Sequence, residues 1–125
     1  MLPGETILDV LTECEQVLFF DDRTTIHEYQ ASFPLYAPKI PIWAAQSSGM
    51  HQLAVWTALE QEGLGANLQH YNPLVDGKIA AEWNIPGEWE LSAQLVFGNP
   101  LSEPNPKTFK PVEDRLKTYG ADVPN

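Results

Sequence analysis

Two patterns in this 125-residue chain predict an α+β fold. Apolar residues recur at helical spacing over residues 50–58, which predicts one long amphipathic helix. Apolar and polar residues alternate over residues 89–97, which is typical of a strand with one buried face. The chain is too short for two cores. We therefore expect one domain, in which a central helix packs on a small, mainly antiparallel sheet.

The first part of the chain predicts two short helices and a strand. Residues 7–11 form the first expected helix. Residues 17–20, VLFF, are a continuous apolar run that fits a strand buried on both faces. Thr25 and Glu28 have the spacing of a capping box, which predicts a helix that Pro34 ends.

The central helix is expected to follow a proline-containing loop. Pro38 and Pro41 predict extended chain over residues 34–43. Ser47 and Ser48 are the expected N-caps of the helix. The stripe expected to face the core consists of Met50, Leu53, Ala54, Thr57 and Ala58.

The end of the central helix and the elements beyond it have clear signals. Gly63 is the expected C′ residue, because glycine adopts the left-handed conformation that ends helices. Residues 76–83 predict a short helix that stops before Pro86. Residues 101–111 are too rich in proline for regular structure, and residues 112–119 predict a last short helix or an extended arm. The buried side of the strand at 89–97 is expected to carry Trp89, Leu91, Ala93, Leu95 and Phe97.

Charge limits the classes of partner. The chain has 17 acidic and 7 basic residues and a net charge of −10, which argues against nucleic acid or an anionic membrane as the main partner. No apolar stretch reaches the length of a membrane span, and the N-terminus lacks the basic start of a signal peptide. A cytoplasmic location is expected.

The usual chemical motifs are not found. The chain has no G-x-G-x-x-G, Walker loop, H-E-x-x-H or C-x-x-C, and its three histidines lie far apart, so no metal site is expected. No catalytic residue is assigned. The unusual feature is QHYN at residues 69–72, directly after the central helix. Four polar side chains are costly to bury without partners, so this run is either a solvated loop or a surface that faces a ligand.

Five collinear stretches carry a family resemblance. They are VLFFDD (17–22), FPLYAPKIPIWAAQSSGMHQLAVWTALEQEGLGANLQHYNPL (33–74), EWNIP (82–86), FG (97–98) and FKPVEDR (109–115). The chain resembles the nitroreductase superfamily, in particular its branch of small FMN-dependent reductases that includes the yeast fatty-acid-repression proteins and bacterial copper-induced nitroreductases. The resemblance divides the chain into an unmatched segment, 1–16, and a partial nitroreductase-like domain, 17–125.

The resemblance implies a function and a cofactor. It implies a homodimer that binds FMN in a pocket shaped by both subunits. NAD(P)H would reduce the flavin, and a nitroaromatic compound or a quinone, both flat molecules, would then take the electrons in a ping-pong reaction. The alternative is a non-catalytic remnant or interaction module of the same fold that binds FMN poorly or not at all.

The resemblance also assigns residues to the cofactor. Lys110 matches the basic residue near the FMN phosphate, with Arg115 a second, although an ordinary surface lysine is the alternative for Lys110. Aromatic Phe33, Tyr36 and Trp43 could border a substrate channel, but packing in the core is favoured. The glycine turn and the loop along the flavin ring correspond to Gly63, Gly65, Leu68, Gln69, His70, Tyr71 and Asn72.

The front of the chain departs from the family pattern. In the family, an Arg-Arg-Thr-like helix and a Gln-Ser-Ser-Arg-like stretch supply arginines for the phosphate and polar contacts for the ribityl chain and the pyrimidine ring of FMN. Neither has a counterpart here. We therefore expect the fold to lack its N-terminal part, with exposed apolar surface on the central helix, weaker FMN binding and reduced stability.

Overall fold

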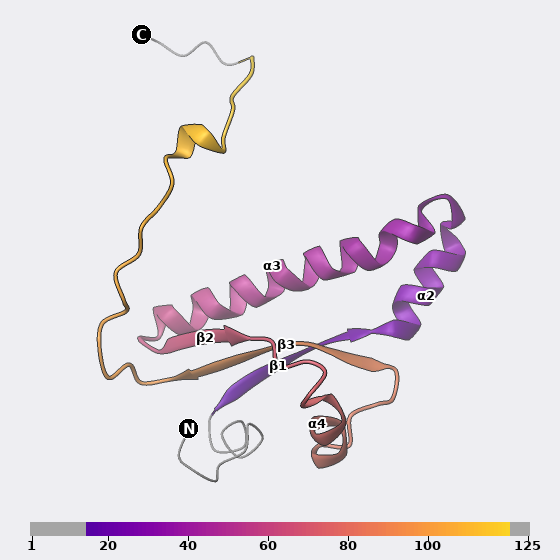
Figure 1. The fold of residues 1–125 in the computed structure, drawn as a ribbon. Helices are drawn as coiled ribbons and strands as arrows, with labels where there is room; N and C mark the ends of the chain where they lie inside the picture. Colours follow the sequence, from indigo (N-terminus) through magenta and orange to yellow (C-terminus); the bar gives the residue numbers. More distant parts are fainter. Residues whose placement is uncertain (1–14, 121–125) are drawn as a thin grey trace.

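The computed structural model describes residues 15–120 (Figure 1). The helix expected at residues 7–11 lies outside this range. Three antiparallel strands form one sheet in the order β1-β3-β2, with α3 on one face and α4 on the other, so the predicted α+β fold is confirmed. The elements are β1 (Gln16–Asp22), α2 (Arg23–Ser32), the 3-10 helix η1 (Pro34–Lys39), α3 (Ile40–Gln61), β2 (Gly65–Gln69), α4 (Asp76–Glu82), β3 (Trp89–Gly98) and the 3-10 helix η2 (Val112–Asp114).

A β-bulge changes which residues of β3 share a face. Phe19 pairs with Ala93 and Phe20 pairs with Leu91, so Ser92 is left without a partner on β1. Leu91 consequently packs with the buried residues of α4, whereas Ala93 packs under α3. The predicted single buried side of this strand is therefore wrong at Leu91. Both faces are covered at the centre of the strand, because the polar Gln94 is fully buried, while Trp89 at the start is 47% exposed.

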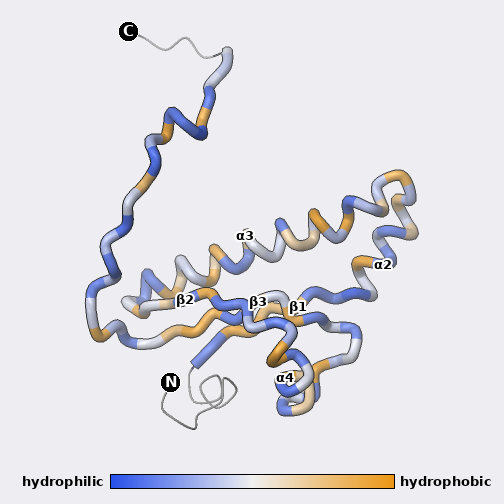
Figure 2. Tube along the Cα trace, in the orientation of Figure 1, coloured by the Kyte–Doolittle hydropathy of each residue, from blue (hydrophilic) through white to orange (hydrophobic). Residues whose placement is uncertain are grey.

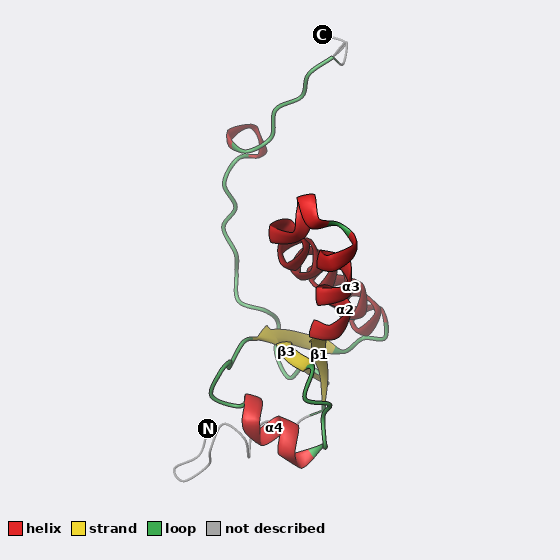
Figure 3. Ribbon diagram, turned by 90° about the vertical axis from the view of Figure 1, so that its right-hand side faces the viewer, coloured by secondary structure: helices red, strands yellow, loops and turns green. Residues whose placement is uncertain are grey.

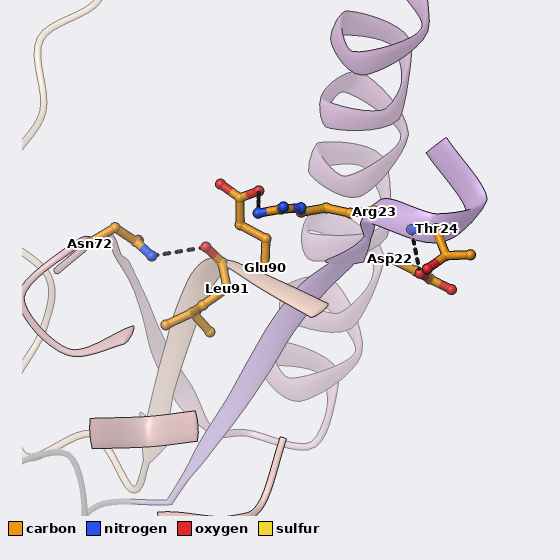
Figure 4. A network of polar contacts seen from close by, with 6 residues as sticks. All are labelled: Asp22, Arg23, Thr24, Asn72, Glu90 and Leu91. Carbon is orange, nitrogen blue, oxygen red and sulfur yellow. Dashed lines mark hydrogen bonds and ion pairs between the residues drawn. The ribbon is translucent and has the colours of Figure 1, made fainter. Parts of the chain in front are cut away.

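The cap of α2 lies three residues before the predicted one. The carboxylate of Asp22 accepts hydrogen bonds from the backbone amides of Thr24, at 3.0 Å, and Thr25, at 3.5 Å (Figure 4). The hydroxyl of Thr25 also donates to Asp22, at 3.0 Å. Asp22 satisfies amides at the start of the helix, so the capping box at Thr25 is not used. The helix ends at Ser32, before Pro34, as predicted.

The central helix α3 starts earlier than the sequence predicts. Residues 34–43, expected to be an extended loop, form η1 and the first turn of α3. Pro41 lies in that first turn, where the amide that proline lacks has no helical acceptor. Ser48 is accordingly an internal residue of the helix and not its cap, and its hydroxyl accepts a hydrogen bond from Gln52 at 3.0 Å.

The C-terminal end of α3 is as predicted. Gly63 has φ +80°, which favours glycine. Its amide donates to the carbonyl of Glu60 at 3.0 Å, and the amide of Leu64 donates to that of Leu59 at 3.1 Å. These two bonds make a Schellman motif, which satisfies carbonyls that the helix leaves open.

The face of α3 that packs on the sheet is not the predicted stripe. Met50 and Leu53 are 68% and 65% exposed. The face that meets the sheet consists of the buried Gln52 and the partly buried Val55, Trp56 and Leu59. Figure 2 shows apolar residues interspersed with polar ones along α3. Apolar side chains lie both on the side that meets the sheet and on the exposed side, where Met50 and Leu53 are found. The described chain covers one side of this helix.

The C-terminal segment, residues 99–120, forms an arm. It leaves the end of β3 and runs away from the sheet in both ribbon views (Figures 1 and 3), with η2 as its one short helical turn. All its side chains are exposed. Within residues 15–120, no helix is both long and apolar enough to cross a membrane.

Candidate functional site

The polar run at residues 69–72 is tied to β3 by its side chains. Asn72 Nδ2 donates to the carbonyl of Leu91 at 2.8 Å and to the Asp76 carboxylate, in the first turn of α4, at 2.8 Å (Figure 4). His70 Nδ1 lies 3.1 Å from the carbonyl of Ser92. The run therefore joins β2, β3 and α4 at one point.

A backbone amide of this loop also binds a buried side chain of β3. The amide of Tyr71 donates to Gln94 Oε1 at 3.1 Å. Gln94 is fully buried, and its Nε2 has no hydrogen-bond partner within residues 15–120. Since β2 stops pairing with β3 at Gln69, these contacts continue the attachment to β3 beyond the end of the ladder.

The loop contacts β3 at the bulge. Ser92 is not paired with any residue of β1 in the strand register. Its side-chain hydroxyl nevertheless donates to the carbonyl of Phe19 at 3.2 Å, and it lies 3.3 Å from the hydroxyl of Ser48 on α3. The carbonyls of Leu91 and Ser92 are the ones that Asn72 and His70 contact. The loop is thus fixed by side chains where a longer β2 strand would have used its backbone.

Several polar atoms of the run form no hydrogen bond within the described residues. They are the side-chain amide of Gln69, His70 Nε2, the Tyr71 hydroxyl and Asn72 Oδ1, and of these four residues only His70 is exposed. Leu68 turns to the other face of the sheet and packs against the core under α3. The run is therefore neither a fully solvated loop nor a surface that faces a ligand along its whole length. Asn72 Nδ2 is bound to the rest of the chain, whereas His70 is bound at Nδ1 and open at Nε2.

Gly63 and Gly65 can be explained in part by the fold, without a ligand. Gly63 supplies the positive φ at the end of α3. A Cβ built on Gly65 would meet the Pro100 side chain at 3.5 Å, an ordinary contact. Both line a groove of about 680 Å³ between the start of β2 and residues 100–104 of the arm.

The two predicted phosphate cations are not beside this loop. Lys110 and Arg115 lie on the exposed arm, which runs away from the sheet (Figures 1 and 3). Gly63 and Gly65 lie at the start of β2, where Gly65 pairs with Gly98 at the end of β3. Residues 70–72 follow the other end of β2 and contact residues 91–94 of β3. The structure of one chain therefore places neither these glycines nor the two cations beside the polar run.

Sequence reasoning missed a pocket of about 480 Å³ between β1, α2 and α3. Its polar lining includes His51 and Ser47, one helical turn apart, and Asp21. Burial raises the pKa of the Asp21 carboxyl, and the charge of Glu90, its cross-strand neighbour, adds to the rise. Glu90 is also 3.8 Å from Arg23 (Figure 4). The i, i+4 spacing of Ser47 and His51 could have pointed to this site.

The three aromatic residues assigned to the core are not in it. Phe33, Tyr36 and Trp43 are all about half exposed, at 51%, 50% and 46%. The rings of Tyr36 and Trp43 contact each other with centroids 5.9 Å apart. The preference for core packing was therefore wrong, because the hairpin of α2, η1 and α3 projects beyond the sheet (Figure 1).

Comparisons with known proteins identify the family. The model of the Nitroreductase family matches residues 4–99 of the chain. The chain belongs to the nitroreductase family. The boundary at residue 17, drawn from the resemblance, stays a prediction.

Close relatives support the assignment. The chain is 44% identical over 93 residues to the putative nitroreductase HBN1 and 46% identical over 93 residues to the nitroreductase FRM2, both of Saccharomyces cerevisiae. Each match covers 74% of this chain and 47% of the relative. The structure of nitroreductase CinD from Lactococcus lactis in complex with chloramphenicol superposes with a TM-score of 0.81 at 47% identity, over 83% of this chain and 55% of CinD.

The chain spans about half the length of these relatives. Its polar groups fit an FMN ring edge in part, since His70 Nε2 and the side-chain amide of Gln69 form no hydrogen bond within residues 15–120. The described chain does not assemble a phosphate site beside residues 68–72, because Lys110 and Arg115 are on the arm.

Proposed function

We propose that this nitroreductase-family chain acts as an FMN-dependent NAD(P)H oxidoreductase that reduces nitroaromatics or quinones by ping-pong chemistry. The observation that carries the proposal is the superposition on CinD, which has been solved with 4-nitrophenol and with nicotinic acid. FMN would supply the hydride transfer. The residues of this chain would hold its ring edge, orient it and keep its phosphate neutralised.

The proposed cofactor residues divide into two groups. Gly63, Gly65 and residues 68–72 would meet the isoalloxazine ring. Lys110 and Arg115 would meet the phosphate, since basic side chains are the natural partners of a dianion in a chain of net charge −10. Phe33, Tyr36 and Trp43 are exposed, which suits a channel for flat substrates better than it suits a core.

A homodimer would bring the two groups together. The arm carries four of the seven basic residues against three acids, whereas the rest of the chain is strongly acidic. At about 3.1 Å per residue, residues 99–120 extend at most about 68 Å, because η2 shortens them slightly, and the 22 residues of α3 span about 33 Å. The arm of one subunit can therefore reach along the exposed side of the partner's α3. Lys110 of the partner subunit would then complete the phosphate site.

Purified protein tests the proposal. We expect yellow protein, or protein that gains a flavin absorption band on FMN addition, with NADH-dependent reduction of 4-nitrophenol. A colourless chain that binds no added FMN would contradict the proposal and support the non-catalytic interaction module. We place the reaction in the cytoplasm, and cell fractionation checks that placement.

A further inference from the structure

The imidazole of His70 is held in one tautomer. Its Nδ1 lies 3.1 Å from the backbone carbonyl of Ser92. A carbonyl oxygen can only accept a hydrogen bond, so Nδ1 must carry the proton. In the neutral ring Nε2 then has a lone pair and no proton, which makes it an acceptor.

The surroundings fix the direction of this ring. The carbonyl that binds Nδ1 belongs to the bulged residue of β3, whose hydroxyl is itself tied to Phe19 on β1. The next residue, Tyr71, is tied through its amide to the fully buried Gln94. The Ser92 carbonyl therefore holds the ring at Nδ1, and the Tyr71 contact fixes the backbone beside it, while the exposed Nε2 has no partner within residues 15–120.

We infer that His70 Nε2 accepts a hydrogen bond from an N–H group of the bound ligand and does not contact a ligand carbonyl. Carbonyl oxygens need a donor, and the neutral ring in this tautomer has none left. The inference rests on the proposed function, in which the ligand is FMN. The oxidised flavin ring has one N–H, at N3, so His70 is the residue that recognises the N3 edge.

The tautomer can be measured without flavin. We expect long-range ¹H–¹⁵N correlation spectra of labelled protein at neutral pH to show His70 protonated on Nδ1, with Nε2 unprotonated. The His70→Gln variant identifies the signals by their loss. A spectrum with the proton on Nε2 would overturn the inference, whatever the protein binds.

Two variants and two ligands test the contact itself. The amide of His70→Asn can still reach the Ser92 carbonyl but has no atom in place of Nε2. We expect the wild-type chain to bind FMN about three- to tenfold more tightly than N3-methyl-FMN, measured by quenching of flavin fluorescence, because the methyl group removes one donor. His70→Asn should bind the two flavins equally. The matched control is His27→Asn on α2, which should keep the wild-type preference.

The outcomes separate this inference from the proposed function. Bound FMN with no preference over N3-methyl-FMN in the wild type would overturn the His70 assignment and leave the proposed function standing. A preference that persists in His70→Asn would also overturn it, because another group must then accept the N3 proton. Failure of the wild type to bind FMN would overturn the proposed function and flavin as the ligand of His70.

Discussion

The loop at residues 69–72 and the arm at residues 99–120 show two ways in which a polar, irregular segment can be ordered. The loop is short and held by β3, through Asn72 to Leu91 and through Tyr71 to Gln94. The arm is exposed throughout, and within residues 99–120 it has one side-chain hydrogen bond, from Lys117 Nζ to the carbonyl of Glu113 at 2.9 Å. The loop is complete within one chain. The arm is exposed along its whole length, and in the proposed homodimer it would lie on the partner subunit.

The largest expected effect comes from cutting the loop off β3. Asn72→Ala removes the donor to the Leu91 carbonyl and to Asp76. We expect the free energy of unfolding, measured by urea denaturation, to fall by about 2 kcal/mol, because a buried polar group loses its partner. Asn105→Ala on the arm is the matched control and should change it by less than about 0.5 kcal/mol. Equal effects of the two substitutions would show that the loop is no better held than the arm.

Substitutions of two glycines of α3 and its C-terminal end test whether Gly63 is required by the backbone conformation. Gly63→Ala should cost about 1 kcal/mol of unfolding free energy, since alanine is strained at φ +80°. Gly49→Ala, inside α3 with no atom within 4 Å of the new Cβ, should instead stabilise by about 0.5–1 kcal/mol. Thermal denaturation of both variants measures the difference. A neutral Gly63→Ala would mean that flavin contact, and not the helix end, is the main demand on that glycine.

The arm is tested through the cofactor. We expect Lys110→Ala to weaken FMN binding about three- to tenfold at low salt and less at high salt, because added ions screen an exposed phosphate contact. Lys78→Ala, on α4 away from the arm, is the control and should leave the dissociation constant unchanged. An unchanged dissociation constant for Lys110→Ala at both salt concentrations would remove this residue from the phosphate site.

The smallest effect concerns Asp21, next to the pocket between β1, α2 and α3. Burial and Glu90 raise the pKa of this carboxyl above 3.8, so the fold disfavours its charged form. The penalty is present above the folded-state pKa and disappears as the pH falls below 3.8. Asp21→Asn should therefore raise the melting temperature slightly at pH 7 and leave it unchanged near pH 3, measured by calorimetry. A lower melting temperature at pH 7 would show that the charge is stabilising.

Local sequence patterns predicted the C-terminal end of α3, but not its start or the face that packs on the sheet. Gly63 marked the end of α3, because the left-handed residue there is a local demand. The start of α3 was missed, since Pro41 reads as a breaker in sequence and is harmless in a first turn. The buried face of α3 was also missed. Apolar residues lie all round this helix, so spacing alone does not say which of them meet the sheet.

The sequence predicted which segment forms the candidate site, but not which residues that segment contacts. QHYN stood out as four polar residues, but its partners lie about twenty residues further along the chain, on a bulge that strict alternation hides. The bulge changes the side of the sheet on which Leu91 lies, and the carbonyls that Asn72 and His70 contact belong to Leu91 and Ser92 at this bulge. Lys110 was assigned by resemblance alone, and its distance from the loop follows from the path of the arm.

Hydrogen exchange at single amides, followed as protein concentration rises, tests the contrast between loop and arm most directly. The account predicts that the Tyr71 amide, bound to the buried Gln94, exchanges slowly at every concentration. The amides of residues 101–110, which precede the turn η2, should exchange at unprotected rates in dilute protein and slow down if subunits associate as proposed. Exchange of Tyr71 as fast as that of the arm would contradict the claim that β3 holds the loop.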